Sequence, residues 1–312
     1  MPRVLVTGGA GFIGSHLVEA TLHRGWSVRV LDDFSTGRRE NLAPFLDEID
    51  LHEGNLADID DVRFAVEGTD YILHQGALPS VPKSLKHPRT TNEANVTGTL
   101  NILVAARDAG VSRVVFAASS SAYGDTPTLP KQEDMPTQPK SPYAIQKLTG
   151  EMYCRTFWEH FGLETVALRY FNIFGPRQDP TSPYSAVIPK FVTACMEDEA
   201  PRINGDGQIS RDFTFIENVV DANLKACTAT SKCAGQVMNV ACGRRVSLNE
   251  LAETIRKAVD RGKAPVHGPE RPGDVLHSLA DISRAEELIG YTPVVDFDRG
   301  IERTVGWYME QA

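Results

Sequence analysis

Two residues of this chain have types and a spacing that suit proton transfer, Tyr143 and Lys147, which lie four positions apart. Ser141 is a candidate helix N-cap and Pro142 is tolerated in a first helical turn, so the pair is predicted to share one helical face. Tyr has an ordinary pKa of about 10 and is a poor base at neutral pH. We expect the fixed ammonium of Lys147 to lower the pKa of Tyr143 by favouring the phenolate. The pair is thus a candidate proton acceptor for an alcohol, which is half of what hydride removal from an alcohol requires.

Tyr and Lys also occur four apart on ordinary amphipathic helices, so this interpretation needs a second motif. Gly8, Gly11 and Gly14 follow the apolar run at residues 4–6 and open a stretch with helical periodicity, and Asp32 ends the next apolar run. In this strand–turn–helix setting, Gly8 is expected to permit the tight turn and Gly11 to let the backbone approach a pyrophosphate. Gly14 is expected to let the helix pack closely, and the helix N-terminus offers unpaired N–H groups to the phosphates.

Asp32 is predicted to select the dinucleotide. A carboxylate at the end of the second strand can accept hydrogen bonds from both hydroxyls of the adenosine ribose, and it repels a 2′-phosphate. NAD is therefore favoured over NADP, although Arg38 and Arg39 nearby leave NADP open. The alternative interpretation of the glycine motif at residues 8–14 is a tight turn that binds no ligand.

The elements that must position these residues alternate between strands and helices. Such alternation predicts an α/β fold with a doubly wound parallel sheet, the Rossmann arrangement. The expected strands are 4–6, 28–31, 49–52, 71–74, 114–116 and 164–169. One helix is expected to begin at residue 12, and three others are expected at 58–66, 95–109 and 143–161.

The pattern changes after Asn172, where Pro and Gly residues interrupt it. We predict a Rossmann domain at 1–172, joined again by about 212–241, and a smaller substrate lobe at 173–211 and 242–312, which covers the carboxyl edge of the sheet. Within the second part we expect a hairpin at 202–207, strands at 211–216 and 236–240, a helix opened by a capping box at 247–250 and ending near 259, and helices at 281–289 and from 301 onward.

Composition narrows the class of protein. The chain has 312 residues, of which 41% are hydrophobic and 23% charged, with a formal net charge of -9. Such an acidic chain is not expected to bind nucleic acid or an anionic membrane non-specifically, and no apolar run is long enough to span a bilayer. The five cysteines form no C-x-x-C pair and the histidines show no ligand spacing, so we expect reduced thiols, a cytoplasmic protein without a signal peptide, and no metal.

The glycine spacing, the Tyr143/Lys147 pair and the chain length together resemble the extended branch of the short-chain dehydrogenase/reductase family, the nucleotide-sugar epimerases and dehydratases. The resemblance implies that Ser119, in the stretch 119–124, hydrogen-bonds the sugar oxygen that is oxidised. Dehydratases of the family carry Asp and Glu where this chain has Ser120 and Ser121. Serine is not a general acid or base near neutral pH without activation, so elimination of water is disfavoured.

The remaining groups imply a 4-epimerase cycle. Tyr143 takes the proton of the 4-hydroxyl while C4 passes a hydride to NAD⁺. The 4-keto sugar then presents its other face to NADH. NADH returns the hydride and Tyr143 returns the proton, so that the configuration at C4 is inverted.

The resemblance also assigns binding residues. For NAD it implies Gly8, Gly11, Phe12, Ile13, Gly14, Asp32, Asn55, Leu56, Gln75, Ala77, Asn95, Tyr143, Lys147 and Tyr170. For a UDP-sugar it implies Ser80, Ser119, Ser120, Ser121, Tyr143, Asn172, Val187, Arg211, Arg271, Asp274 and Ser278. Asn95 is also a candidate helix N-cap.

Ser278 is implied to select the sugar. Family members restricted to UDP-glucose and UDP-galactose carry a bulky Tyr at this position, whereas a small residue leaves room for an acetamido group at C2. The resemblance therefore favours UDP-GlcNAc and UDP-GalNAc, with UDP-glucose and UDP-galactose as weaker substrates. A UDP-glucuronate 4-epimerase, a net nucleotide-sugar oxidoreductase and a non-catalytic nucleotide-binding protein stay open as alternatives. The family also implies a homodimer that pairs helices 95–109 and 143–161.

Overall fold

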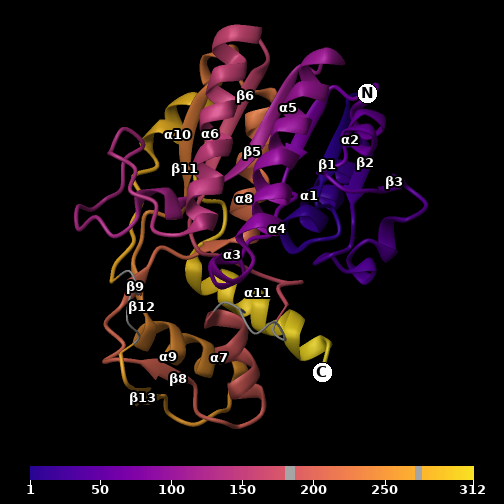
Figure 1. Ribbon diagram of the computed structural model, residues 1–312. Helices are drawn as coiled ribbons and strands as arrows, with labels where there is room; N and C mark the ends of the chain where they lie inside the picture. Colours follow the sequence, from indigo (N-terminus) through magenta and orange to yellow (C-terminus); the bar gives the residue numbers. More distant parts are fainter. Residues whose placement is uncertain (180–186, 271–275) are drawn as a thin grey trace.

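The computed structural model describes residues 1–179, 187–270 and 276–312 (Figure 1). In this part of the chain, seven parallel strands form one sheet in the order β11-β6-β5-β4-β1-β2-β3. The predicted doubly wound α/β fold is confirmed. The strands are β1 (Arg3–Thr7), β2 (Ser27–Asp32), β3 (Ile49–Glu53), β4 (Tyr71–His74), β5 (Arg113–Ser119), β6 (Glu164–Tyr170) and β11 (Gln236–Val240).

Helices cover both faces of this sheet. Apolar residues of α2, α5 and α6 form one buried cluster with the strands, and those of α1 and α8 belong to a second cluster. Strands enclosed on both faces carry nearly continuous apolar runs, which is why the sequence reveals them. The helices are α1 (Phe12–His23), α2 (Ile59–Val66), α5 (Gly98–Asp108), α6 (Pro142–Phe161) and α8 (Ile216–Thr228).

A smaller group of elements lies below the carboxyl edge of the sheet in Figure 1, where α7 and α9 pack together and α11 packs on both. By contrast, α10 contacts β11 and α8 and so lies against the larger body. The strands and helices after β6 that remain to be named are β7 (Ile173–Phe174), α7 (Val187–Met196), β8 (Arg202–Asn204), β9 (Ser210–Arg211), β10 (Thr214–Phe215), β12 (Val246–Ser247), α9 (Leu248–Val259), β13 (Val266–Gly268), α10 (Ser283–Ile289) and α11 (Phe297–Glu310). The domain boundaries given above stay a prediction.

Short helical segments fill several of the connections. They are η1 (Arg39–Asn41), η2 (Ala43–Phe45), α3 (Val81–Lys86), α4 (Pro88–Asn92), the π-helical turn η3 (Glu93–Thr97), η4 (Ser120–Tyr123) and η5 (Ser231–Cys233). None of the described helices combines the length and the apolar character needed to cross a bilayer.

Three local predictions were wrong. The segment 202–207 forms no hairpin, because β8 pairs in parallel with the distant β13. The segment 211–216 is not one strand: β10 ends at Phe215, and Ile216 already begins α8. Helix 95–109 begins earlier, since the chain is helical from Pro88 onward through α4 and η3. Asn95 therefore lies inside a helical segment and is not its N-cap.

Helix α6 is fixed closely against β5. Ser141 caps the helix as predicted, with its Oγ accepting a hydrogen bond from the Ala144 N–H at 3.2 Å. One turn after Lys147, Gly150 faces the ring of Phe116, and a Cβ atom there would overlap that ring. The absent side chain lets α6 approach β5 and brings the Tyr143 face of the helix to the carboxyl end of the strand.

Candidate active site

Tyr143, Lys147 and Ser119 come together where β5 ends. Ser119 is the last residue of β5, and its side chain hydrogen-bonds that of Tyr143. Lys147 is buried, and its Nζ donates to the carbonyl oxygen of Ala117 at 2.8 Å. The Nζ also lies 5.0 Å from the centre of the Phe116 ring. A phenol, a hydroxyl and an ammonium thus converge at the edge of the sheet where ligands bind in this class of fold.

The expected direction of the Tyr143 pKa shift was wrong. Burial raises the pKa of Tyr143 above its ordinary value, and the hydrogen bond from Ser119 opposes this only in part. Burial also lowers the pKa of Lys147 to about 8. Loss of hydration disfavours both charged forms, and it is the largest cause of both pKa shifts.

The serine turn after β5 is internally hydrogen-bonded. Ser119 Oγ accepts from the Ser121 N–H at 3.2 Å and from the Ser121 hydroxyl at 2.9 Å. Ser120 begins the short helix η4. Ser121 therefore supports Ser119, and neither Ser120 nor Ser121 supplies a general acid or base for elimination.

The glycine turn has the shape that a dinucleotide requires. Gly8 has φ +66, and a Cβ there would lie 2.7 Å from Gly76 Cα. A Cβ at Gly14 would overlap the Gly8 carbonyl oxygen, so close packing of the turn depends on that glycine. Gly11 caps α1 without a side chain, and Phe12 and Ile13 form the first helical turn. The N–H groups of this turn can therefore bind an anion, which fits the pyrophosphate of NAD.

Asp32 lies across this turn as expected. Its carboxylate accepts hydrogen bonds from the Ala10 N–H and the Phe34 N–H, both at 2.8 Å. The two arginines that left NADP open both form ion pairs with carboxylates, Arg38 with Asp179 at 2.7 Å and Arg39 with Glu53 at 2.6 Å. These pairs reduce the positive charge available to a 2′-phosphate, which favours NAD.

Asn223, which sequence analysis missed, forms hydrogen bonds with the side chains of both Gln75 and Tyr170. The Tyr170 hydroxyl lies 3.3 Å from Gln75 Oε1, and Asn223 Nδ2 donates to the same hydroxyl at 2.8 Å. Burial raises the pKa of Tyr170 to about 12, so this group stays neutral. Asn223 belongs to α8, a helix that was not predicted, and no motif marked it.

Asn95 supports the loop that follows β4. Its Oδ1 accepts from the Leu78 N–H at 2.7 Å, and its Nδ2 donates to Gln146 Oε1 at 2.8 Å. Ala77 precedes Leu78 in this loop and is partly exposed. Gln146 was also missed, although its position between Tyr143 and Lys147 was a usable signal.

Two further predicted cofactor residues lie in the loop after β3. Asn55 is exposed, and its Oδ1 accepts from the Ala57 N–H at 2.9 Å. Leu56 is partly buried against Gly76 and Gly98. Their contacts with NAD stay a prediction.

On the substrate side, Asn172 and Ser278 are in contact. Asn172 Nδ2 donates to Ser278 Oγ at 3.2 Å and to the Asp212 carbonyl oxygen at 3.0 Å. Asn172 has φ +36, a left-handed conformation that Asn tolerates better than most residues. Arg211 Nη1 donates to the Ser210 carbonyl oxygen at 3.0 Å. The structure thus brings three of the predicted substrate residues into one region.

Asp212 holds this region together and was missed. Its buried carboxylate accepts from the N–H groups of Cys242, Gly243 and Ala280 at 3.0, 3.1 and 3.1 Å. Burial raises the pKa of Asp212 to about 6. Its donors come from segments far apart in the sequence, which is why no local pattern revealed the role.

The remaining predicted substrate residues are less well connected. Ser80 caps α3, with its Oγ accepting from the Lys83 N–H at 3.1 Å. Val187 is the first residue of α7. Arg271 and Asp274 lie outside the described residues.

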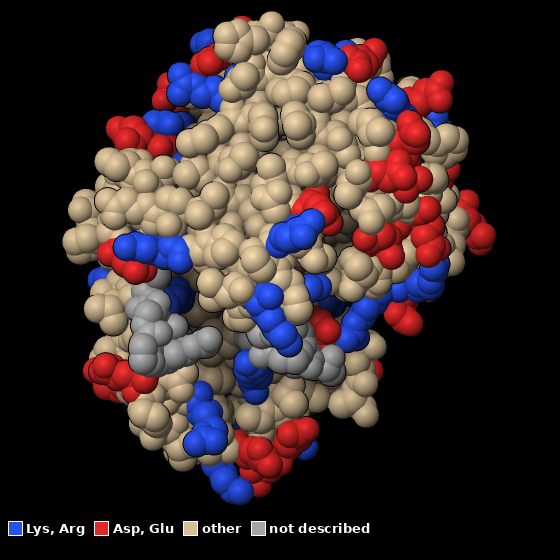
Figure 2. Space-filling view, viewed as in Figure 1, with Lys and Arg blue, Asp and Glu red and all other residues tan. Residues whose placement is uncertain are grey.

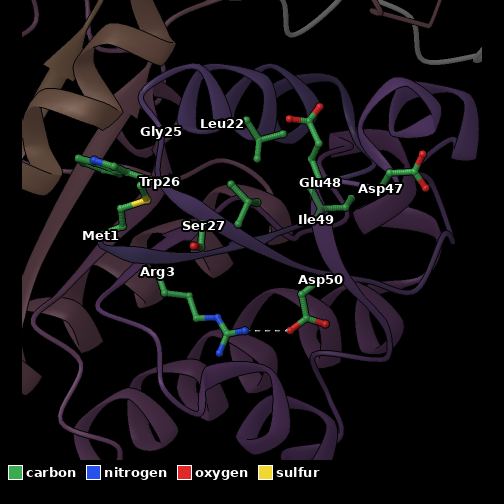
Figure 3. Close-up of a pocket in the computed structure, with 11 residues that line it drawn as sticks. Met1, Arg3, Leu22, Gly25, Trp26, Ser27, Asp47, Glu48, Ile49 and Asp50 are labelled. Carbon is green, nitrogen blue, oxygen red and sulfur yellow. Dashed lines mark hydrogen bonds and ion pairs between the residues drawn. The ribbon is translucent and has the colours of Figure 1, made fainter.

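The face of the molecule in Figure 2 has a hollow between the sheet-bearing body and the smaller group of elements, with Lys and Arg side chains around its rim. Positive charge at this rim suits an anionic ligand even though the whole chain is acidic. A different cavity, of about 470 Å³, lies where β1, β2 and β3 begin (Figure 3). Arg3, Trp26 and Asp50 line it at the amino edge of the sheet, opposite Ser119, so it is not the site described above.

Comparison with known proteins agrees with this geometry. The model of the NAD dependent epimerase/dehydratase family matches residues 4–241. A protein named UDP-glucose 4-epimerase from Mycolicibacterium smegmatis is 38% identical over 99% of both chains.

Two solved structures extend the comparison. The UDP-N-acetylglucosamine 4-epimerase from Methanobrevibacter ruminantium M1, in complex with UDP-N-acetylmuramic acid, is 40% identical with a TM-score of 0.95, over 100% of this chain and 99% of that one. The UDP-glucose 4-epimerase of Thermus thermophilus, in complex with NAD, is 34% identical with a TM-score of 0.88, over 99% of this chain and 100% of that one. The chain therefore belongs to the NAD-dependent epimerase/dehydratase family, and NAD is its cofactor.

Proposed function

We propose that this protein is a UDP-sugar 4-epimerase that interconverts UDP-GlcNAc and UDP-GalNAc and also accepts UDP-glucose and UDP-galactose. The observation that carries the proposal is the small side chain of Ser278 beside Asn172, with 3.2 Å between Ser278 Oγ and Asn172 Nδ2. A serine here leaves space for a C2 acetamido group that a tyrosine would fill. The likeness to a UDP-N-acetylglucosamine 4-epimerase over the whole chain supports the same substrate class.

The residues at the end of β5 suit reversible oxidation at C4. NAD⁺, when bound, supplies the acceptor for the C4 hydride and the donor that returns it. Ser119 orients the 4-hydroxyl, Tyr143 takes its proton and later gives it back, and Lys147 supplies a positive charge behind the phenol. Since the serines at 120 and 121 cannot eliminate water, the sugar keeps all its hydroxyls.

The direct test is to incubate the purified protein with UDP-GlcNAc, UDP-glucose or UDP-glucuronate, without added NAD, and to separate the C4 epimers by chromatography. We expect turnover of the first two, because the cofactor is regenerated in each cycle and need not leave. Faster turnover of UDP-glucuronate than of UDP-GlcNAc would replace this proposal with the uronate alternative. No epimer from any of the three would refute it.

Ser278→Tyr tests the assignment of the sugar. We expect turnover of UDP-GlcNAc to fall by at least about tenfold, because the phenol ring would occupy the space for the acetamido group. Turnover of UDP-glucose should change much less. Ser278→Ala is the matched control, since it removes the same hydroxyl without adding bulk. An equal loss with both sugars in Ser278→Tyr would contradict the assignment.

We also infer that the protein forms a homodimer through α6. Ile145 and Met152 lie two turns apart on this helix with 53% and 58% of their surface exposed. Large apolar side chains repeated along one helix face suit a contact with a second copy of the chain.

A further inference from the structure

The buried ammonium of Lys147 requires an explanation, because a charge removed from water is costly unless a partner compensates it. Its Nζ donates one hydrogen bond, to the Ala117 carbonyl oxygen. The face that carries Tyr143 and Lys147 on α6 continues four residues later with Glu151. Only 4% of the Glu151 side chain is exposed, so a carboxylate is buried on the same helical face as the ammonium.

Glu151 is itself held by a second buried charge. Arg169, on β6, donates through Nε to Glu151 Oε1 at 2.9 Å and through Nη2 to Oε2 at 2.8 Å. The Arg169 side chain is also 4% exposed, and its guanidinium lies 4.6 Å from the centre of the Tyr123 ring. A two-pronged pair of this kind fixes the orientation of the carboxylate.

The other titratable groups that face Lys147 carry no opposite charge. In the described part of the chain these are His74 on β4 and Tyr143 and Cys154 on α6. Burial lowers the pKa of His74 to about 3 and raises the pKa of the Cys154 thiol far above neutrality, so both are uncharged. Glu151 is therefore the anion that acts on Lys147, and it opposes the effect of burial on the pKa of Lys147.

We propose that Glu151 is a positioning residue that keeps the Lys147 ammonium charged behind Tyr143, acting from one helical turn away while Arg169 fixes the orientation of its carboxylate. This inference rests on the proposed function only through the role of Lys147. Both carboxylate oxygens accept hydrogen bonds from Arg169, and Lys147 precedes Glu151 by one helical turn on the same buried face. The charge on Lys147 would then depend on a carboxylate that is not among the residues proposed to bind the substrate.

Glu151→Gln tests the charge while keeping the shape and an acceptor for Arg169. We expect Lys147 to lose its proton at a pH lower by about one unit, because the compensating charge is gone and that of Arg169 stays. The alkaline limb of the epimerisation rate should move down by the same amount. Glu151→Asp, which restores the charge, should move both back toward the wild type.

The double variant Glu151→Gln/Arg169→Gln removes both charges of the pair, so no buried arginine is left without its carboxylate. This variant also lacks the carboxylate that acts on Lys147, so we expect Lys147 to lose its proton at a lower pH than in the wild type. It also keeps the test decisive if Glu151→Gln folds poorly.

The primary measurement is NMR titration of isotope-labelled lysine in the purified protein, with the Lys147 signal assigned by its loss in Lys147→Met. This readout needs no turnover, so it stands even if no UDP-sugar is epimerised and the proposed function fails. If Lys147 titrates at the same pH in the wild type and in both Gln variants, Glu151 only packs and the inference is overturned.

Discussion

At the scale of single residues, the chemistry of the site depends on whether Tyr143 can accept a proton. Burial disfavours its charged form and the Ser119 hydrogen bond opposes this, and in the proposed mechanism the positive charge of Lys147 would add to that opposition. The sequence predicted Tyr143 and Lys147 from their types and local spacing, and the family resemblance added Ser119. It indicated the wrong direction for the Tyr143 pKa, because the loss of hydration depends on atoms from β5 and other distant segments.

Tyr143→Phe tests the proton acceptor. We expect the epimerisation rate to fall by about 10²–10⁴, the usual contribution of a positioned acid–base group, while the fold persists because a phenyl ring fits the same space. The measurement is initial rate by epimer chromatography, with circular dichroism as a check on folding. Tyr153→Phe, on the same helix but outside the site, should retain wild-type activity. Full activity of Tyr143→Phe would remove Tyr143 from the mechanism.

Lys147→Met tests the cost of the buried charge. Below a pH of about 8 the lysine is charged in both folded and unfolded states, so the folded state bears the full cost of burial. Between about 8 and 10.5 the folded state loses the proton first, and the free energy of unfolding of the wild type rises through this window. We expect the wild type to gain up to about 3 kcal/mol relative to Lys147→Met across it. Urea unfolding at several pH values measures the difference, and parallel curves for the two proteins would contradict the assignment.

At the scale of elements, the sequence predicted the strands well and the long-range pairings poorly. The strands β1, β2, β4 and β5 are short apolar runs, and their burial on both faces makes the pattern visible. By contrast, β8 pairs with β13, which lies far along the chain, and nothing within 202–207 encodes that partner. The same holds for Asp212, whose hydrogen-bond donors lie in the segments 242–243 and 280.

Gly150→Ala tests the close contact between α6 and β5. Alanine favours helix by about 1 kcal/mol over glycine, yet here the added methyl would overlap the Phe116 ring. We expect a net destabilisation of about 1–3 kcal/mol, together with a lower rate as Tyr143 and Lys147 are displaced. Gly306→Ala on α11 is the matched control, because no atom lies within 4 Å of the new methyl group. Chemical denaturation should show Gly306→Ala to be stabilised, and equal effects at both sites would refute the packing argument.

At the scale of the whole molecule, the proposed dimer is the part that the sequence predicted only through resemblance. The structure adds the exposed apolar residues Ile145 and Met152 on α6, the helix that also carries the catalytic pair. Because Ile145 lies between Tyr143 and Lys147 in the sequence, a second copy that covers it would also hold the catalytic turn of the helix in place.

Met152→Glu tests the dimer. A carboxylate in an apolar contact must be desolvated without a partner, so we expect the protein to shift from dimer to monomer at micromolar concentration. Sedimentation velocity measures the change. Lys257→Glu on α9 is the control, since Lys257 is exposed, pairs with Glu253 within its own helix and lies away from α6. A wild-type protein that sediments as a monomer would overturn the inference outright.

The last strand of the sheet has a consequence for how the protein is made. The chain completes β6 at residue 170, contributes β7 to β10 and α7 elsewhere, and only then adds α8 and β11 beside β6. While the ribosome is still adding residues 171–235, the backbone of β6 has an unpaired side that can recruit strands from other nascent chains. We therefore expect fragments that stop near residue 172 to aggregate more than fragments that reach residue 241, in which β11 can pair with β6.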